Sequence, residues 1–291
     1  MQAGPEPPSF VFQLVVTLVV LVAIYAVMTI VDKSINAYSS VSQTAAVLIP
    51  DTTQDTSIIP QSLQSDAPLL YPSSNQPTGM EFSYSCFLKI DPATFSTSSA
   101  TTCSTNTTNS SGVSPVILKH IFSKGTAKSF PLMAPGVFVQ ANTNTLVVYM
   151  NTVNSWNNTA KVDNIPIDKF FHLGIVLTGS YMDIYINGNV ANRVKFNSVP
   201  KINFGPVFIL NPRKFPDSPS VPKSISDVFV VDGAAKAMIS RLQYFAYAMN
   251  YSQIDSLYRQ GPSSKISGSG VLQTPPYLAD TWWVGQAPGS S

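Results

Sequence analysis

The hydrophobic pattern begins with one long apolar run. Residues 10–31, FVFQLVVTLVVLVAIYAVMTIV, contain no charged side chain, and Gln13, Thr17 and Thr29 are the clearly polar ones. As an α-helix, these 22 residues span ~33 Å at ~1.5 Å each, which matches the ~30 Å apolar core of a bilayer. We therefore predict a transmembrane helix over residues 10–31, after a short leader at residues 1–9, and a single-pass membrane protein.

A cleaved signal peptide is the alternative for this run. The leader MQAGPEPPS has no Lys or Arg, and the run is longer than the ~7–15 residues of a signal-peptide core. Both features favour the anchor, although SINAYSS after the run leaves a cleavage site open. Lys33, on the C-terminal side, slightly favours a cytosolic position for the rest of the chain.

Residues 32–79 lack regular periodicity and are rich in Pro, Ser and Thr. No Lys or Arg occurs between Lys33 and Lys89. Because such a composition does not bury enough apolar surface to fold alone, we predict an extended linker. It either acts as a flexible spacer or lies along a partner surface, in which case Ile58–Ile59 and Leu69–Leu70 are its docking points.

From residue 80 to residue 261 the pattern changes to short β segments, separated by Gly, Pro, Asn and Ser. Alternation is clear where Met182, Ile184 and Ile186 share one face of a strand. Asn187-Gly188 then fits a type I′ turn, because both central residues of that turn need positive φ. The pattern predicts an all-β sandwich. The segments are MEFSYSCFLKID, VILKHIFS, GVFVQA, TLVVYMNT, KFFHLGIVLT, YMDIYIN, NVANRVKF, PVFIL, ISDVFVV and MISRLQYFAYAM.

One short helix is predicted directly after the last strand. Ser252 is its predicted cap, Asp255 lies three residues later, and Ile254, Leu257 and Tyr258 form an apolar face. Gly261-Pro262 is expected to end it.

Residues 262–291 form an extended tail, rich in Gly, Ser and Pro, that contains PPYLADTWW. The adjacent Trp282 and Trp283 need cover, which either the β-sandwich or a partner provides. Large aromatic side chains are common anchors at interfaces. With Tyr277, they are therefore the candidate partner-docking residues.

The order of these segments resembles the concanavalin A-like lectin/glucanase superfamily, in particular its laminin-G-like jelly-roll domains. The blocks that carry the resemblance are His120–Gly125, Ile167–Phe196 and Ile239–Gly261. The middle block looks like the family's core of an aromatic-His pair, strands and an Asn-Gly turn. The resemblance implies an antiparallel jelly-roll β-sandwich over residues 80–261.

A narrower resemblance concerns the ending RQGP followed by PPYLADTWW, joined to an N-terminal anchor. It is similar to membrane-anchored members of this fold that large DNA viruses encode. The resemblance implies a virion structural protein, namely a minor capsid component that links an internal membrane to the capsid shell. Its partners would be capsid proteins.

Composition narrows the classes of partner. Only 11% of the residues are charged, against ~25% in typical soluble domains, and the net charge is +2. Because the sequence has no Lys/Arg cluster, it argues against a nucleic-acid partner. An uncharged, hydrogen-bonding surface suits contacts with protein or sugar.

Acid–base chemistry is limited to few side chains, since the sequence has two Glu, Glu6 and Glu81, and two His, His120 and His172. Retaining glucanases need two carboxylates ~5 Å apart. Glu81 is alone in its segment, and no second acid lies two or four residues from Asp183. We predict that His172 is structural, that His120 lies at the surface, and that the chain has no catalytic residues and is not an enzyme.

No set of His, Cys and carboxylates has metal-ligand spacing, so we predict neither a metal nor another cofactor. Calcium is the alternative, because the laminin-G-like resemblance implies Asp and Asn oxygens at a loop rim. The calcium candidates are Asp163, Asn164, Asp227 and Asp232.

Two modifications stay open. Cys86 and Cys103 either form a disulfide across a short loop rich in Ser and Thr or remain free thiols. Asn-x-Ser/Thr sequons are used only if the domain is lumenal, and they lie at Asn106, Asn109, Asn157 and Asn250.

Two functions are weighed from these features. The first is a membrane-tethered structural or interaction protein. The second is a glycan-binding surface lectin, in which Trp156 stacks on a sugar while Asn154 and Asn157 contact its hydroxyls. The alternative for Trp156 is an ordinary loop residue that packs against the sandwich.

Overall fold

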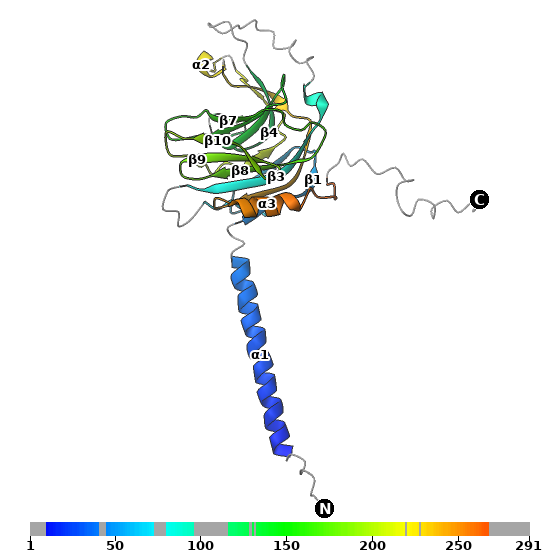
Figure 1. Ribbon diagram of the computed structural model, residues 1–291. Coiled ribbons are helices and arrows are strands. Elements are labelled where there is room, and N and C mark those ends of the chain that lie inside the picture. Colours follow the sequence, from blue (N-terminus) through cyan, green and yellow to red (C-terminus); the bar gives the residue numbers. More distant parts are fainter. Residues whose placement is uncertain are drawn as a thin grey trace, which may run out of the picture. The chain divides into compact units, whose positions relative to one another are not determined.

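The structure is a computed structural model that describes residues 10–40, 45–72, 80–95, 116–127, 130, 132–218, 220–226 and 228–267. By its contacts the chain divides into two units, residues 1–45 and residues 46–291. The first contains a single long helix, and the second contains the β-sheets (Figure 1).

Helix α1 spans Phe10–Ser40 and is longer than the predicted 10–31. It continues because residues 32–40 contain neither Pro nor Gly. Thr17 and Thr29 donate their hydroxyls to backbone oxygens of the preceding turn. Among the described residues, no helix is both long and apolar enough to cross a membrane. The predicted transmembrane helix over residues 10–31 is therefore not found.

The first sheet of the second unit has six strands, and the order is β1-β14-β3-β8-β9-β10. From β14 to β10 every neighbouring pair is antiparallel. The strands are β1 (Ala45–Thr53), β14 (Ala237–Phe245), β3 (Phe82–Ile90), β8 (Phe171–Leu177), β9 (Tyr181–Ile186) and β10 (Asn189–Lys195).

The second sheet has the order β12-β13-β4-β5-β6-β7, with β11 pairing to β4 and β2 to β11. Its pairs are antiparallel except for β13 and β4. The strands are β12 (Lys214–Phe215), β13 (Val230–Ala234), β4 (Ile117–Gly125), β5 (Met133–Gln140), β6 (Leu146–Met150), β7 (Asn158–Val162), β11 (Val207–Ile209) and β2 (Ser57–Ile59).

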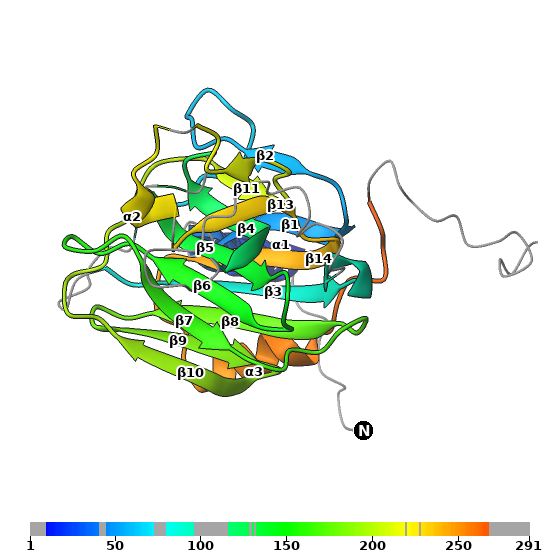
Figure 2. The same cartoon turned by 90° about the horizontal axis from the view of Figure 1, so that it is seen from above.

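The two sheets pack face to face as a β-sandwich (Figures 1 and 2). The main core lies between them and contains alternate residues of β3 such as Tyr84, Leu88 and Ile90, together with Phe122 of β4. Cys86 lies in this core as a free thiol, whose pKa is raised by burial. The prediction of an all-β sandwich is therefore confirmed.

The predicted hairpin is also confirmed. Residues Asn187 and Gly188 join β9 to β10 with φ values of 50° and 82°. A type I′ turn needs both to be positive, and Asn and Gly adopt such values at the least cost.

The predicted linker was wrong in part, because it supplies two strands. β1 pairs with β14, and its Leu48 and Ile49 enter the core. β2 pairs with β11 and buries Ile59, while Leu70 packs against the same core. Local periodicity did not reveal these strands, because their partners lie far away in the sequence.

The C-terminal part of the sandwich adds cover to the first sheet. Helix α3 (Tyr251–Arg259) follows β14 as predicted, but its cap is Asn250 and not Ser252. Asn250 Oδ1 accepts from the Gln253 amide, and Gln253 Oε1 accepts from the Asn250 amide, each at 2.9 Å. This reciprocal pair is a capping box, which satisfies two backbone donors at the helix start.

Two short helices were not predicted: α2 (Lys223–Ser226) and the 3-10 turn η2 (Pro92–Phe95). α2 replaces the start of the predicted strand ISDVFVV, so that β13 begins only at Val230.

The predicted tail also begins later than residue 262. Thr52 of β1 bonds with Lys265 and Ser267 on either side of a parallel bridge to Ile266.

Candidate functional site

Several predicted site residues lie outside the described part of the chain. These are Tyr277, Trp282 and Trp283 of the tail, the calcium candidate Asp227, Cys103, and the sequons at Asn106 and Asn109. Their roles stay predictions.

The predicted glycan contact, Trp156, lies in the loop between β6 and β7. Its ring packs edge-on against Phe130 and Phe229, with centroids 5.0 Å and 5.7 Å away. Both contacts belong to an aromatic cluster on the second sheet, centred on Phe229. The structure thus supports the alternative in which Trp156 packs against the sandwich.

The asparagines around Trp156 mainly hold its loop. Asn158 donates to Met150 O at 3.3 Å and to Thr152 Oγ1 at 3.1 Å. Asn157 accepts from Ser155 Oγ at 2.8 Å. Asn154 and Asn157 are exposed, and Trp156 is half-buried.

Both histidines are buried, so the surface position predicted for His120 was wrong. His120 lies within β4, where its Nδ1 accepts from the Asn211 amide at 3.0 Å and its Nε2 contacts Ser123 Oγ at 2.9 Å. This arrangement places the proton on Nε2. Burial lowers the pKa of His120 to about 3. The surface prediction failed because both faces of β4 are buried from His120 to Gly125.

His172 is buried beneath α3, as a structural residue in β8. Its Nε2 lies 2.8 Å from Ser85 Oγ, and its Nδ1 has no hydrogen-bond partner. Burial lowers the pKa of His172 to about 4. A Ser–His pair without an acid on Nδ1 lacks the third member of a triad. The ring of Tyr258 lies over this side, 6.1 Å from the His172 ring.

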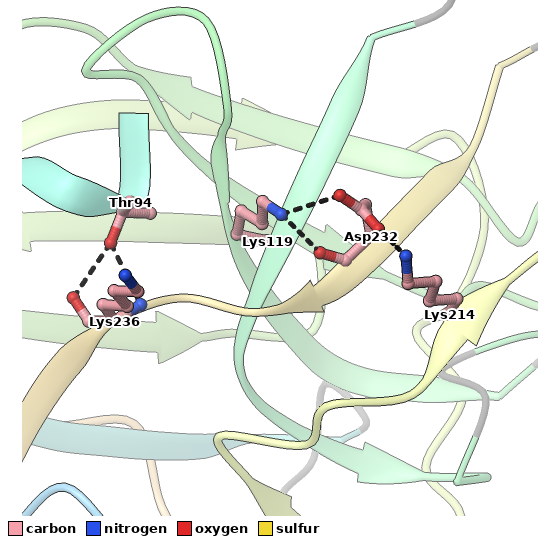
Figure 3. A network of polar contacts seen from close by, with 5 residues as sticks. All are labelled: Thr94, Lys119, Lys214, Asp232 and Lys236. Atoms are coloured by element: carbon pink, nitrogen blue, oxygen red, sulfur yellow. Dashed lines mark hydrogen bonds and ion pairs between the residues drawn. The ribbon is translucent and has the colours of Figure 1, made fainter. Parts of the chain in front are cut away.

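The calcium candidate Asp232 belongs to a lysine network (Figure 3). Lys119 donates to Asp232 Oδ2 at 2.8 Å, and Lys214 lies 2.8 Å from Oδ1. Burial pushes the pKa of Asp232 up, but the two lysines outweigh it and hold the pKa below its ordinary value.

Another calcium candidate, Asp163, accepts a hydrogen bond from the Thr145 hydroxyl at 2.7 Å. Within the described residues, no group of His, Cys, Asp and Glu is arranged to hold a metal.

A neutral groove of about 390 Å³ lies between the end of β14 and α3. Its apolar lining includes Phe245 and Tyr247, whose rings meet edge-on at 5.8 Å. Its polar lining is uncharged and includes Asn250, Gln253 and Ser256. The capping box engages the side-chain oxygens of Asn250 and Gln253, so their NH2 groups are not used by it.

A second, smaller recess of about 20 Å³ contains a buried cation. Lys124 is 8% exposed, and its ammonium donates to the backbone oxygens of Asn203 and Gly205. Tyr84 lines the same recess, is 1% exposed, and its hydroxyl has no hydrogen-bond partner. Burial lowers the pKa of Lys124 to about 8.

Sequence reasoning missed both the groove and the recess. In the last predicted β segment, Phe245 and Tyr247 flank the buried Ala246, and this pair of aromatic residues was a signal for the groove. Lys124 within an apolar segment was a signal for the recess, because lysine is rarely buried unless it is paired.

Comparisons with known proteins do not assign this chain to a family. No protein-family model matches the chain, and no curated protein matches it. The solved structures that resemble it include the receptor-binding domain of botulinum neurotoxin D, with 13% identity and a TM-score of 0.44 over 74% of this chain and 48% of that one. The receptor-binding domain of the C/D mosaic serotype has 12% identity and a TM-score of 0.42 over 64% and 37%.

The binding domain of serotype G has 15% identity and a TM-score of 0.42, over 75% of this chain and 46% of that one. The chain thus spans less than half the length of each of these domains. At this level of similarity nothing about its function follows from them.

Proposed function

We propose that this protein is a non-catalytic interaction protein whose β-sandwich, of the concanavalin A-like jelly-roll type, is attached to a membrane through α1. The observation that carries the proposal is the apolar surface of α1. The large apolar side chains described between Phe12 and Val31 are exposed by 45–72%. A continuous apolar surface of this kind needs a cover of lipid or protein.

The non-catalytic part of the proposal is supported by the state of the reactive side chains. His120 and His172 are buried and neutral at pH 7, because burial lowers their pKa values to about 3 and about 4. Asp232 is engaged by two lysines, and Asp183 is engaged by Arg193 at 2.6 Å and 2.7 Å. These groups serve packing and charge pairing.

In its most specific form, the proposal is a minor capsid component that links an internal virion membrane to capsid proteins. This form rests on the resemblance of the anchor and the PPYLADTWW segment. Its test is whether the chain is recovered with the particle membrane after the outer shell has been removed.

The membrane attachment is tested by flotation of the full chain with liposomes and by alkaline extraction. Val19→Lys with Val22→Lys places two charges in α1, where Val19 and Val22 are 60% and 61% exposed. Each lysine replaces an apolar side chain that would contact lipid with a charge that is costly to bury, so the double variant should lose flotation. Val190→Lys, at a position 51% exposed on β10, is the matched control.

The expected result is that the wild type and the control float and resist extraction, while the double variant does neither. If alkaline extraction releases the wild type, or if the double variant floats equally well, the attachment through α1 is wrong.

A second candidate function is glycan binding, and the groove beside α3 favours it. Aromatic rings stack on sugars, and the uncharged NH2 and hydroxyl groups of Asn250, Gln253 and Ser256 suit neutral sugar hydroxyls. Binding to a glycan array should be lost with Tyr247→Ala and kept with Tyr181→Ala. If both variants bind as the wild type does, this groove is not the glycan site.

A further inference from the structure

Lys124 lies in an unusual setting for a lysine. Its side chain is buried near the end of β4, between Tyr84 and the segment that precedes β11. Its ammonium is held by the backbone oxygens of Asn203 and Gly205 and lies 3.5 Å from Asn203 Oδ1. Among the described residues, no carboxylate lies within ion-pair distance of it.

The lack of a counter-charge has a physical consequence. Carbonyl dipoles hydrogen-bond an ammonium, but they do not neutralise it, and a buried charge is costly unless it is paired. The pKa of Lys124 reflects this, because burial alone accounts for its decrease to about 8. An anion beside Lys124 would remove most of this cost.

Tyr84 gives a second, independent observation at the same place. Tyr84 lines the recess, and its hydroxyl is buried and donates to nothing. Its neighbour Tyr244 does not accept from it, and Tyr244 Oη donates to Tyr71 O at 2.7 Å. A buried hydroxyl without a partner costs about 1–3 kcal/mol.

A single chemical group would supply both the charge that Lys124 lacks and the acceptor that Tyr84 lacks. A carboxylate carries the negative charge that Lys124 lacks and the acceptor oxygens that the Tyr84 hydroxyl lacks. The remaining walls are apolar and include Leu70, Phe82 and Ile202. The mouth carries Phe204, which is 77% exposed and belongs to a segment without regular secondary structure.

We propose that the recess between Lys124 and Tyr84 is a binding site for a carboxylate attached to an apolar group. The carboxylate enters the recess, and the apolar group packs against Phe204 and the apolar walls. Such a group comes either from a free small acid or from the C-terminal residue of a partner peptide. The site is independent of the attachment through α1.

The test is calorimetric titration of the full chain in mild detergent with phenylacetate, and with phenylacetamide as the neutral match. A second pair of probes is a short peptide that ends in Phe, with a free or an amidated C-terminus. Binding of phenylacetate alone identifies a free acid as the ligand class. Binding of the free-carboxylate peptide identifies a partner C-terminus.

The variants separate the site from non-specific partition. Lys124→Met should weaken carboxylate binding by at least about tenfold, since a hydrogen bond to a charged group is lost. Tyr84→Phe removes only the hydroxyl and should weaken binding severalfold while the core is kept. Lys201→Met, at an exposed position of the same segment, should bind as the wild type does.

Binding by the wild type should also weaken above pH 8, as Lys124 loses its proton. The proposal is overturned if acid and amide bind equally, if no carboxylate binds the wild type, or if Tyr84→Phe and Lys124→Met both bind as the wild type does.

Discussion

Strand β4 carries two largely buried lysines that differ in one respect. Lys119 is 13% exposed and has a carboxylate partner, Asp232, whose other oxygen is engaged by Lys214 (Figure 3). Lys124 has only carbonyl oxygens. Since both lie on one strand, the difference comes from what packs across from each. A completed charge pair indicates a structural role, whereas an uncompensated cation indicates a place for a ligand.

The largest expected effect on stability comes from removing the partner of Lys119. Asp232→Ala leaves Lys119 buried without a counter-charge, so we expect a loss of about 3 kcal/mol in the free energy of unfolding. Chemical denaturation of the full chain measures it, followed by tryptophan fluorescence, to which Trp156 in its aromatic cluster contributes. A loss below about 1 kcal/mol would mean that Lys119 finds another partner, and the contrast with Lys124 would weaken.

The pH dependence of stability is expected to reveal that Lys124 lacks a counter-charge. The pKa of Lys124 is lowered by burial from 10.5 to about 8. Between these values the unfolded chain binds more protons than the folded one, so stability rises with pH by at most about 3 kcal/mol. The difference between the wild type and Lys124→Met, measured at pH 8 and at pH 10.5, isolates this contribution. A flat difference would show that Lys124 titrates normally.

At pH 7 the effect of Lys124→Met should be small. The change removes a costly buried charge and also leaves the oxygens of Asn203 and Gly205 without a donor, so we expect the two effects to cancel to within about 1 kcal/mol. The same denaturation measurement decides it. A loss as large as that of Asp232→Ala would make Lys124 a structural residue.

The smallest effect is expected at the outer lysine. Lys214 is 69% exposed, so its pair with Asp232 is screened by solvent, and Lys214→Met should change stability by less than about 1 kcal/mol. Raising the salt concentration should reduce the difference further. A loss close to that of Asp232→Ala would show that the outer pair, and not Lys119, holds Asp232.

The sequence predicts the locally coded parts of this fold. The turn at Asn187-Gly188 follows from the φ values its residues tolerate, and the alternation around Ile184 identifies a strand without its neighbours. β1 and β2 are missed because their burial depends on β14 and β11, far away in the sequence. The cap of α3 is misplaced by two residues, since Asn250 and Ser252 are both suitable cap residues.

The candidate site is less predictable for the same reason. Trp156 was predicted as a glycan contact, with packing against the sandwich as the alternative, and its ring packs against Phe130 and Phe229, which lie in other segments. Lys124, Tyr84 and Asn203 come from three separate segments and form a recess only after both sheets have packed. No local sequence pattern indicates that a buried lysine lacks a counter-charge.

The most direct test of the contrast between the two lysines is the titration of the Lys124 side chain by NMR, in protein labelled with ¹³C-lysine and assigned with Lys124→Met. The account predicts a pKa of about 8 for Lys124 in the free chain and an increase when phenylacetate is added. A pKa near 10.5 in the free chain, unchanged by phenylacetate, would contradict it.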